Sequence, residues 1–181
     1  MTRVQITGAA GSGCTTLGRA LAARLGCVDL DTDTYFWLPS DPPFQQLRDR
    51  AERVALLAAD LDRHESWTIS GSLSGWGDVF IPRFDLVVFL WIPPEIRLAR
   101  LRERELRLFG AEALAPGGRM HETHARFMAW AAEYDTADAS MRSRARHEQW
   151  LQIVPCPVVR LEGAGTVEEQ VAEVMRRAER R

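Results

Sequence analysis

Residues 4–15 read Val-Gln-Ile-Thr-Gly-Ala-Ala-Gly-Ser-Gly-Cys-Thr, a short β-prone run followed by a glycine-rich segment. Apolar residues then recur at helical spacing from Leu17 to Leu25. The sequence therefore predicts a strand, a loop and a helix in that order. The segment from Gly8 to Thr15 fits the pattern GxxxxG-x-[ST], and its place between a strand and a helix favours a phosphate-binding loop.

The glycines of this loop allow backbone conformations that other residues disfavour, so successive N–H groups can turn toward one anion. The N-terminus of the following helix adds partial positive charge. We expect the loop to bind a nucleoside triphosphate through Gly8, Ala9, Ala10, Gly11, Ser12, Gly13, Cys14, Thr15 and Thr16. Thr15 has its hydroxyl at the position that ligates Mg²⁺. The alternative is a glycine-rich turn that binds nothing.

Cys14 stands where the motif places a lysine that neutralises the β- and γ-phosphates. A thiol cannot supply that charge. All 23 basic residues of the chain are arginine, so no lysine from another segment can take its place. Either arginine, Mg²⁺ and backbone amides supply the missing charge, or phosphoryl transfer is impaired.

The rest of the chain alternates between strands and helices, which is typical of a parallel sheet. Further strands are predicted at residues 27–30, 67–69, 86–92 and 157–161. Helices are predicted at residues 47–61, 94–109, 119–134 and 138–151, and from Thr166 onward. The run at 86–92 is continuously apolar, as in a strand buried on both faces. We therefore predict an α/β fold of three layers with a central five-stranded parallel sheet.

Composition narrows the class of protein. The 181 residues fit one domain, residues 1–181, and the net charge of −2 gives no basic excess for binding nucleic acid. No apolar run reaches about 20 residues, and no signal peptide is apparent, so we expect a cytoplasmic protein. The three cysteines have no CxxC spacing, which favours reduced thiols over a disulfide framework or a zinc site.

In these motifs the chain resembles the P-loop kinases of the adenylate kinase, shikimate kinase and uridine kinase type. The resemblance covers most of the chain and includes the phosphate loop, Asp31-Thr-Asp33 after the second strand and Arg100-Leu-Arg-Glu-Arg104 after the fourth. It implies a five-stranded parallel sheet, a helical lid near residues 107–120, and ATP with Mg²⁺ as the phosphoryl donor.

Asp31 and Asp33 follow a predicted strand, at the edge where open α/β sheets bind ligands. The resemblance implies that Asp31 binds the metal together with Thr15. It also implies that Asp33 is catalytic and contacts the acceptor hydroxyl. The alternative is that the two aspartates form a turn or cap a helix, as short acidic residues often do.

Aromatic residues are predicted to form the acceptor site. Tyr35 and Trp37 follow the acidic pair and suit stacking on a base or sugar, although core packing is equally open for each. Gly71 and Trp76, after the third strand, would close the site from the other side. Nucleoside monophosphate kinases usually have an aspartate-glycine pair and an arginine here. This chain has Ser70-Gly71 with no arginine close in sequence, which counts against a monophosphate acceptor.

Four arginines recur at spacings of three and four and should share one helix face: Arg97, Arg100, Arg104 and Arg107. The resemblance implies that Arg100 lies by the adenine and that Arg104 is catalytic and reaches phosphate. The alternative is a solvated stripe paired with neighbouring glutamates. Arg142 and Arg146 are further candidates for contact with phosphate.

We therefore expect an ATP-dependent kinase that phosphorylates a hydroxyl of a nucleoside-like or sugar-like acceptor. Positioning and charge neutralisation supply most of the catalysis in such transfers. Two alternatives stay open: a nucleotide-binding protein without efficient catalysis, suggested by Cys14, and a nucleoside monophosphate kinase.

Overall fold

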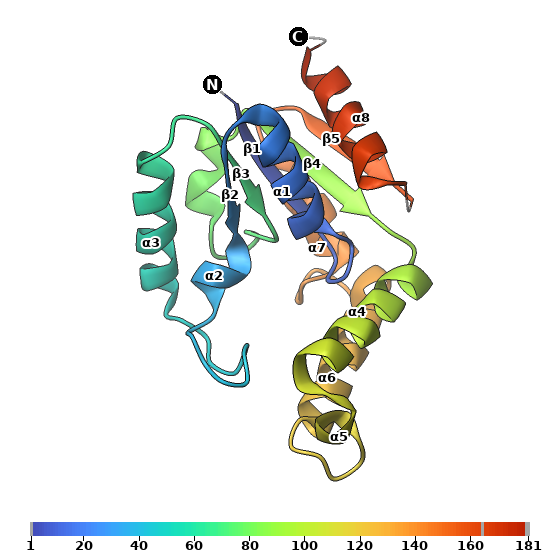
Figure 1. Cartoon of the computed structure of the whole chain (residues 1–181). Coiled ribbons are helices and arrows are strands. Elements are labelled where there is room, and N and C mark those ends of the chain that lie inside the picture. The colour runs from blue at the N-terminus through green and yellow to red at the C-terminus, as the bar shows by residue number, and fades with distance from the viewer. Residues whose placement is uncertain (1, 164, 180–181) are drawn as a thin grey trace.

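A computed structural model describes residues 2–163 and 165–179, and it contains a parallel sheet with helices on both faces (Figure 1). The five strands are β1 (Arg3–Gly8), β2 (Val28–Asp31), β3 (Trp67–Ser70), β4 (Leu86–Trp91) and β5 (Val158–Glu162). Their spatial order is β2-β3-β1-β4-β5, and each neighbouring pair is parallel. The predicted three-layer α/β fold is confirmed.

Eight α-helices are described: α1 (Cys14–Leu25), α2 (Thr32–Phe36), α3 (Arg50–Asp62), α4 (Pro94–Phe109), α5 (Ala111–Leu114), α6 (His121–Ala132), α7 (Arg144–Gln152) and α8 (Val167–Glu179). Short 3₁₀ helices span Asp78–Arg83 and Glu133–Asp135. Figure 1 shows α4, α5 and α6 extending beyond the carboxyl edge of the sheet. Within the described ranges, none of these helices has the length and apolar character that crossing a membrane requires.

Side chains alternate along the strands and supply two separate cores. Val87 and Phe89 of β4 pack in one core, which also contains residues of α3 and α7. Val88 and Leu90 of the same strand pack in the other, with Leu17 of α1 and residues of α8. Both faces of β4 are therefore apolar, which explains its continuous hydrophobic run.

Three boundaries differ from the predicted ones. The strand predicted at 27–30 extends to Asp31, which also caps the short helix α2, as the capping alternative for the acidic pair allows. Leu47 lies outside α3 and is 53% exposed, because Asp49 caps that helix and its first residue is Arg50. The helix predicted at 138–151 begins only at Arg144, because the residues before it form turns.

The helix predicted from Thr166 onward is α8, and it begins with a capping box formed by Thr166 and Glu169. The Thr166 N–H donates to Glu169 Oε2 over 2.8 Å, and the Glu169 N–H donates to Thr166 Oγ1 over 3.2 Å. Replacing Thr166 by alanine leaves one N–H without its acceptor and should lower the free energy of unfolding by about 1 kcal/mol. Urea denaturation of Thr166→Ala, beside Gln170→Ala in the same helix, measures the loss. Equal stability of the two variants would show that the box contributes little.

Candidate functional site

The loop between β1 and α1 can approach an anion closely. Gly11 has φ of +77° and Gly13, which caps α1, has φ of +98°, both in the region that favours glycine. The Ser12 N–H donates to the Ala9 carbonyl oxygen over 3.2 Å. Helix α1 has 12 residues and no acidic residue in its first turn. Its unpaired N-terminal N–H groups can therefore attract negative charge.

A cleft of about 1480 Å³ lies where the carboxyl ends of β1, β2 and β3 meet. Most of the residues predicted for the site line it: Ala9, Ala10, Gly11, Gly13, Cys14, Thr15, Thr16, Asp31, Asp33, Trp37, Gly71, Trp76, Arg100 and Arg104. Gly8 ends β1, and Ser12 is buried within the loop. Segments that are far apart in the sequence thus meet around one cavity.

Asp31 and Asp33 lie beside each other at this edge. Asp31 Oδ1 accepts the Asp33 N–H over 3.0 Å, and Asp31 Oδ2 lies 3.8 Å from Arg19 Nη2. Asp33 is open to the water of the cleft, yet surrounding protein atoms partly desolvate it and raise its pKa. Asp31 adds to the rise, while Arg142 and Arg104 oppose it. A carboxylate with a raised pKa is suited to accepting a proton.

An aromatic wall borders the cleft beside Asp33. Phe36, Trp37 and Trp76 line it together. The Phe36 ring lies 5.3 Å from the Trp37 ring and 6.2 Å from the Trp76 ring, centroid to centroid, and both pairs meet edge to face. Trp76 is held in place because its Nε1–H donates to the Ser72 carbonyl oxygen over 3.0 Å. The wall offers flat apolar surface to a ring-shaped ligand.

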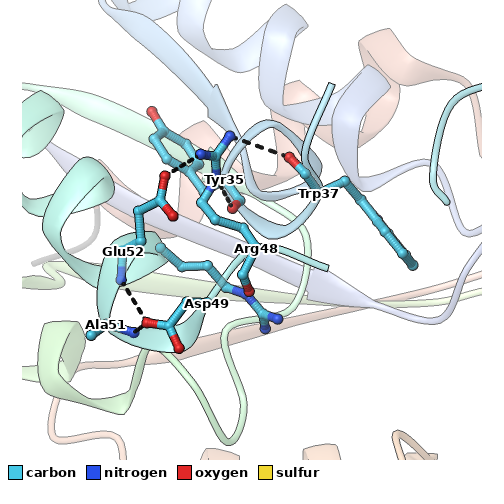
Figure 2. Close-up of polar contacts among 7 residues, drawn as sticks. Tyr35, Trp37, Arg48, Asp49, Ala51 and Glu52 are labelled. Carbon is cyan, nitrogen blue, oxygen red and sulfur yellow. Dashed lines mark hydrogen bonds and ion pairs between the residues drawn. The ribbon is translucent and has the colours of Figure 1, made fainter. Parts of the chain in front are cut away.

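Tyr35 does not line the cleft, which corrects its predicted role in acceptor binding. Its side chain is 5% exposed, and its hydroxyl donates to Asp60 Oδ2 over 2.7 Å. Figure 2 shows Arg48 donating to the carbonyl oxygens of Tyr35 and Trp37, over 3.0 and 3.4 Å, while the Trp37 indole points away from this cluster. Tyr35 lies within α2, whereas Trp37 follows the helix in an extended conformation, and of the two only Trp37 lines the cleft.

Arg100, Arg104 and Arg107 extend from α4 toward the cleft. Arg100 Nη1 donates to the Ser12 carbonyl oxygen over 3.4 Å, so this exposed arginine reaches the phosphate loop. The Arg104 guanidinium lies 5.6 Å from the Phe127 ring centroid. Arg104 Nε is buried and makes no hydrogen bond to any described residue. These three arginines share a face as predicted, and that face borders the cleft.

Arg97 departs from the predicted stripe. Its side chain is fully buried, Nη1 donates to the Ala131 carbonyl oxygen over 2.9 Å, and Nη2 forms an ion pair with Asp135. Arg97 therefore joins α4 to the end of α6, and the solvated-stripe interpretation is wrong for this residue. The helical spacing predicted that Arg97 lies near Arg100, but it could not show that Arg97 is buried and paired with Asp135.

Two arginines from the segment that precedes and begins α7 also reach the cleft. Arg142 Nη2 donates to the Gly8 carbonyl oxygen over 2.9 Å. Arg146 Nη1 donates to the Ala139 carbonyl oxygen over 3.1 Å. Arg146 also lies so close to Gly75 that a Cβ there would collide with the guanidinium. An arginine does therefore lie beside the segment that follows β3, although the sequence shows none nearby.

The Cys14 thiol is enclosed by the loop and supplies no charge. It is 8% exposed, and its Sγ lies 3.3 Å from Ser12 Oγ. Burial raises the pKa of the thiol, which is the largest influence on it. Cys14 is therefore neutral at physiological pH and does not supply the charge of the lysine that the motif places here.

A buried histidine network behind the cleft has no counterpart in the predicted site. His147 is fully buried; its Nε2 lies 2.9 Å from Ser72 Oγ, and its Nδ1 lies 2.7 Å from the Tyr134 hydroxyl. Burial, followed by the charges of Arg142 and Arg146, lowers the pKa of His147 to about 3. The imidazole is therefore neutral. It orients the side chain of Ser72, which lines the cleft.

The described residues contain no cluster of three or more His, Cys, Asp or Glu side chains that could hold a metal ion. A divalent cation here would depend on few protein ligands. The Thr15 hydroxyl and the Asp31 carboxylate both line the cleft and could hold it together with phosphate oxygens and water. Mg²⁺ usually keeps several waters, so this sparse set of ligands suits it.

The glycine-rich loop between a central parallel strand and a helix defines a P-loop NTPase fold. The chain belongs to the family described as "AAA domain", which matches residues 4–108. It is 47% identical over 172 residues to "Uncharacterized protein YqaC" of Bacillus subtilis (strain 168), covering 95% of this chain and 94% of that protein. It is 24% identical over 119 residues to "Cytidylate kinase" of Archaeoglobus fulgidus, covering 57% of this chain and 62% of that protein.

Solved structures of kinases share the fold. Shikimate kinase from Acinetobacter baumannii, in complex with shikimate, has a TM-score of 0.57 at 18% identity, with 97% of this chain and 92% of that chain covered. A gluconokinase from Sinorhizobium meliloti 1021 has a TM-score of 0.55 at 17% identity, with 99% of this chain and 92% of that chain covered. The chain therefore has a kinase-like P-loop fold.

Proposed function

We propose that this protein is an ATP-dependent kinase that transfers the γ-phosphoryl group to a hydroxyl of a nucleoside-like or sugar-like small molecule. The main support is the convergence, in one cleft, of a phosphate loop, an acidic pair, several arginines and an aromatic wall. The kinase-like fold and the kinases among the similar proteins agree with this class of activity.

The donor half of the site suits a nucleoside triphosphate. The phosphate loop, in which Gly13 has a positive φ, and the N-terminus of α1 form a concave surface for phosphate. Arg100 lies beside this surface. The buried Nε–H groups of Arg104 and Arg142 are further donors, since neither makes a hydrogen bond to any described residue. Mg²⁺, when bound, neutralises phosphate charge. The Thr15 hydroxyl and the Asp31 carboxylate would hold it.

The acceptor half lies between Asp33 and the aromatic wall. Trp37 and Trp76 would enclose the ring of the acceptor, and Gly71 lines the same pocket. Asp33 would accept the proton of the attacking hydroxyl, for which its raised pKa is suited. Arg104 would stabilise the charge that develops on the transferring group. The helices near residues 107–120 would act as a lid.

A nucleoside monophosphate is the second candidate acceptor, because Arg146 lies against the segment that follows β3. The sequence argues against this class on two grounds, Ser70 in place of the usual aspartate and the absence of a nearby arginine, and Arg146 removes only the second. The guanidinium of Arg146 has no carboxylate within 4.0 Å among the described residues, so it is available to an anionic group. A nucleotide-binding protein without efficient catalysis is the third candidate, suggested by Cys14.

Calorimetry with Mg-ATP and turnover assays with a panel of acceptors test these candidates. We expect nucleotide binding and ADP release that depends on one acceptor among nucleosides, sugars and nucleoside monophosphates. Binding without transfer to any acceptor would favour the non-catalytic protein. Failure to bind any nucleoside triphosphate would contradict all three candidates.

A further inference from the structure

Position 14 lacks the positive charge that a phosphate loop normally contains. The chain has no lysine, and burial keeps the Cys14 thiol neutral. Backbone N–H groups and a helix N-terminus supply only partial charges, which leaves most of the charge on three terminal phosphate oxygens to be balanced. A full positive charge close to position 14 is therefore the missing part of the site.

Arg142 is a cationic side chain that binds the start of the loop beside Cys14. Its Nη2 donates to the Gly8 carbonyl oxygen over 2.9 Å, and the Cys14 sulfur lies on another side of Gly8, where a Cβ added to that glycine would come within 3.2 Å of it. The positive charge of Arg142 also acts on the thiol and on the Asp33 carboxyl. The guanidinium therefore contacts the start of the loop and acts electrostatically on Asp33 across the cleft.

The Arg142 guanidinium keeps unused hydrogen-bonding capacity. It has five N–H donors. Its Nε is buried without a hydrogen-bond partner among the described residues, and no described carboxylate lies within 4.0 Å of it. Donors left unpaired at the edge of a cleft are costly unless a ligand or water satisfies them. A planar guanidinium can engage phosphate oxygens through two parallel bonds.

The backbone around Arg142 is fixed before any ligand binds. The fully buried Ser143 caps α7, since its Oγ accepts the Arg146 N–H over 3.1 Å and donates to the Asp138 carbonyl oxygen over 2.5 Å. The Arg146 guanidinium also donates a hydrogen bond to the Ala139 carbonyl oxygen. A side chain presented from such a segment loses less conformational entropy on binding.

The other arginines of the cleft fit this role less well. Arg100 is exposed, and its contact with the loop is a long one, 3.4 Å to the Ser12 carbonyl oxygen. Arg104 has Glu105 as a neighbour, 3.5 Å from its Nη2. Neither is among the charges that act on the Cys14 thiol, whereas Arg142 is.

We propose that Arg142 replaces the missing lysine of the phosphate loop and binds the β- and γ-phosphates of the nucleoside triphosphate. This inference rests on the proposed function and adds to it a binding residue that lies 128 positions beyond Cys14. It also explains how a loop with cysteine at this position can keep a binding role.

Calorimetry of ATP and AMP binding to four proteins tests the inference: the native chain, Arg142→Met, Arg144→Met, and Arg142→Met combined with Cys14→Lys. Loss of Arg142 should weaken ATP binding about ten- to a hundredfold, as expected for hydrogen bonds to a charged group. AMP affinity should change less than about threefold, because AMP lacks both terminal phosphates. Cys14→Lys should recover most of the lost ATP affinity.

Arg144→Met is the matched control, because it removes one charge from the same segment. Arg144 packs over the Trp91 ring at 5.2 Å and is outside the lining of the cleft. Thermal melts check the fold of each variant. If Arg142→Met does not fold, Arg142→Lys takes its place; it keeps the charge but loses the paired donors, so ATP binding should still weaken severalfold.

Equal ATP affinity of the Arg142 and Arg144 variants would overturn this inference and leave the proposed kinase standing. Equal losses for ATP and AMP would also overturn it, because the effect would then not arise at the terminal phosphates. If the native chain binds no ATP, the proposed function itself fails, and this inference falls with it.

Discussion

Replacing Arg104 by alanine is expected to lower the rate of phosphoryl transfer by about 10³-fold or more. An arginine that acts on developing transition-state charge can contribute roughly 10³ to 10⁵ in kcat. Arg104 borders the cleft, has a buried Nε with no described partner, and acts electrostatically on Asp33. Single-turnover transfer with the acceptor found by the panel measures the effect.

Arg102→Ala is the matched control for Arg104→Ala. Arg102 is exposed on the same helix and does not line the cleft, so its loss should leave the rate near that of the native chain. Arg104→Lys keeps the charge but not the planar donors and should recover only part of the rate. A native-like rate for Arg104→Ala would contradict the proposed catalytic role.

The fold could be predicted because its signals are local. The glycines between Gly8 and Gly13, the apolar run from Leu86 and the pair Thr166 and Glu169 each specify their element within a few residues. Short connections between alternating strands and helices then leave few possible topologies. The loop residues that line the cleft beside α1 followed from the same local pattern.

The contacts of the residues that complete the cleft could not be predicted, because they depend on tertiary packing. Arg142 reaches Gly8 across 134 residues, and Arg146 reaches Gly75 only after α7 packs. The sequence names both arginines only as further candidates for contact with phosphate and does not indicate which segments they contact. The direction of Tyr35 depends on the short helix α2, which the sequence suggested only as a possible cap.

Replacing Asp33 by asparagine is expected to lower kcat by at least about a hundredfold while leaving ATP affinity nearly unchanged. A positioned acid–base group contributes typically 10² to 10⁴ in rate. Asp33 lines the cleft together with the arginines and the aromatic wall, and Arg142 and Arg104 act on it electrostatically. Steady-state turnover gives the rate, and calorimetry with ATP shows whether the donor site is intact. Asp41→Asn, an exposed acid outside the cleft, is the control.

The pH dependence gives a second readout for Asp33. The carboxylate must be deprotonated to accept a proton, so activity should be present above its pKa and lost as the pH falls through it. Because desolvation and Asp31 raise the pKa of Asp33, this loss should occur at a higher pH than for an ordinary aspartate. The residual activity of Asp33→Asn should lack this acidic limb. If the variant keeps both the native rate and the native acidic limb, another group accepts the proton, and Asp33 serves only to shape the cleft.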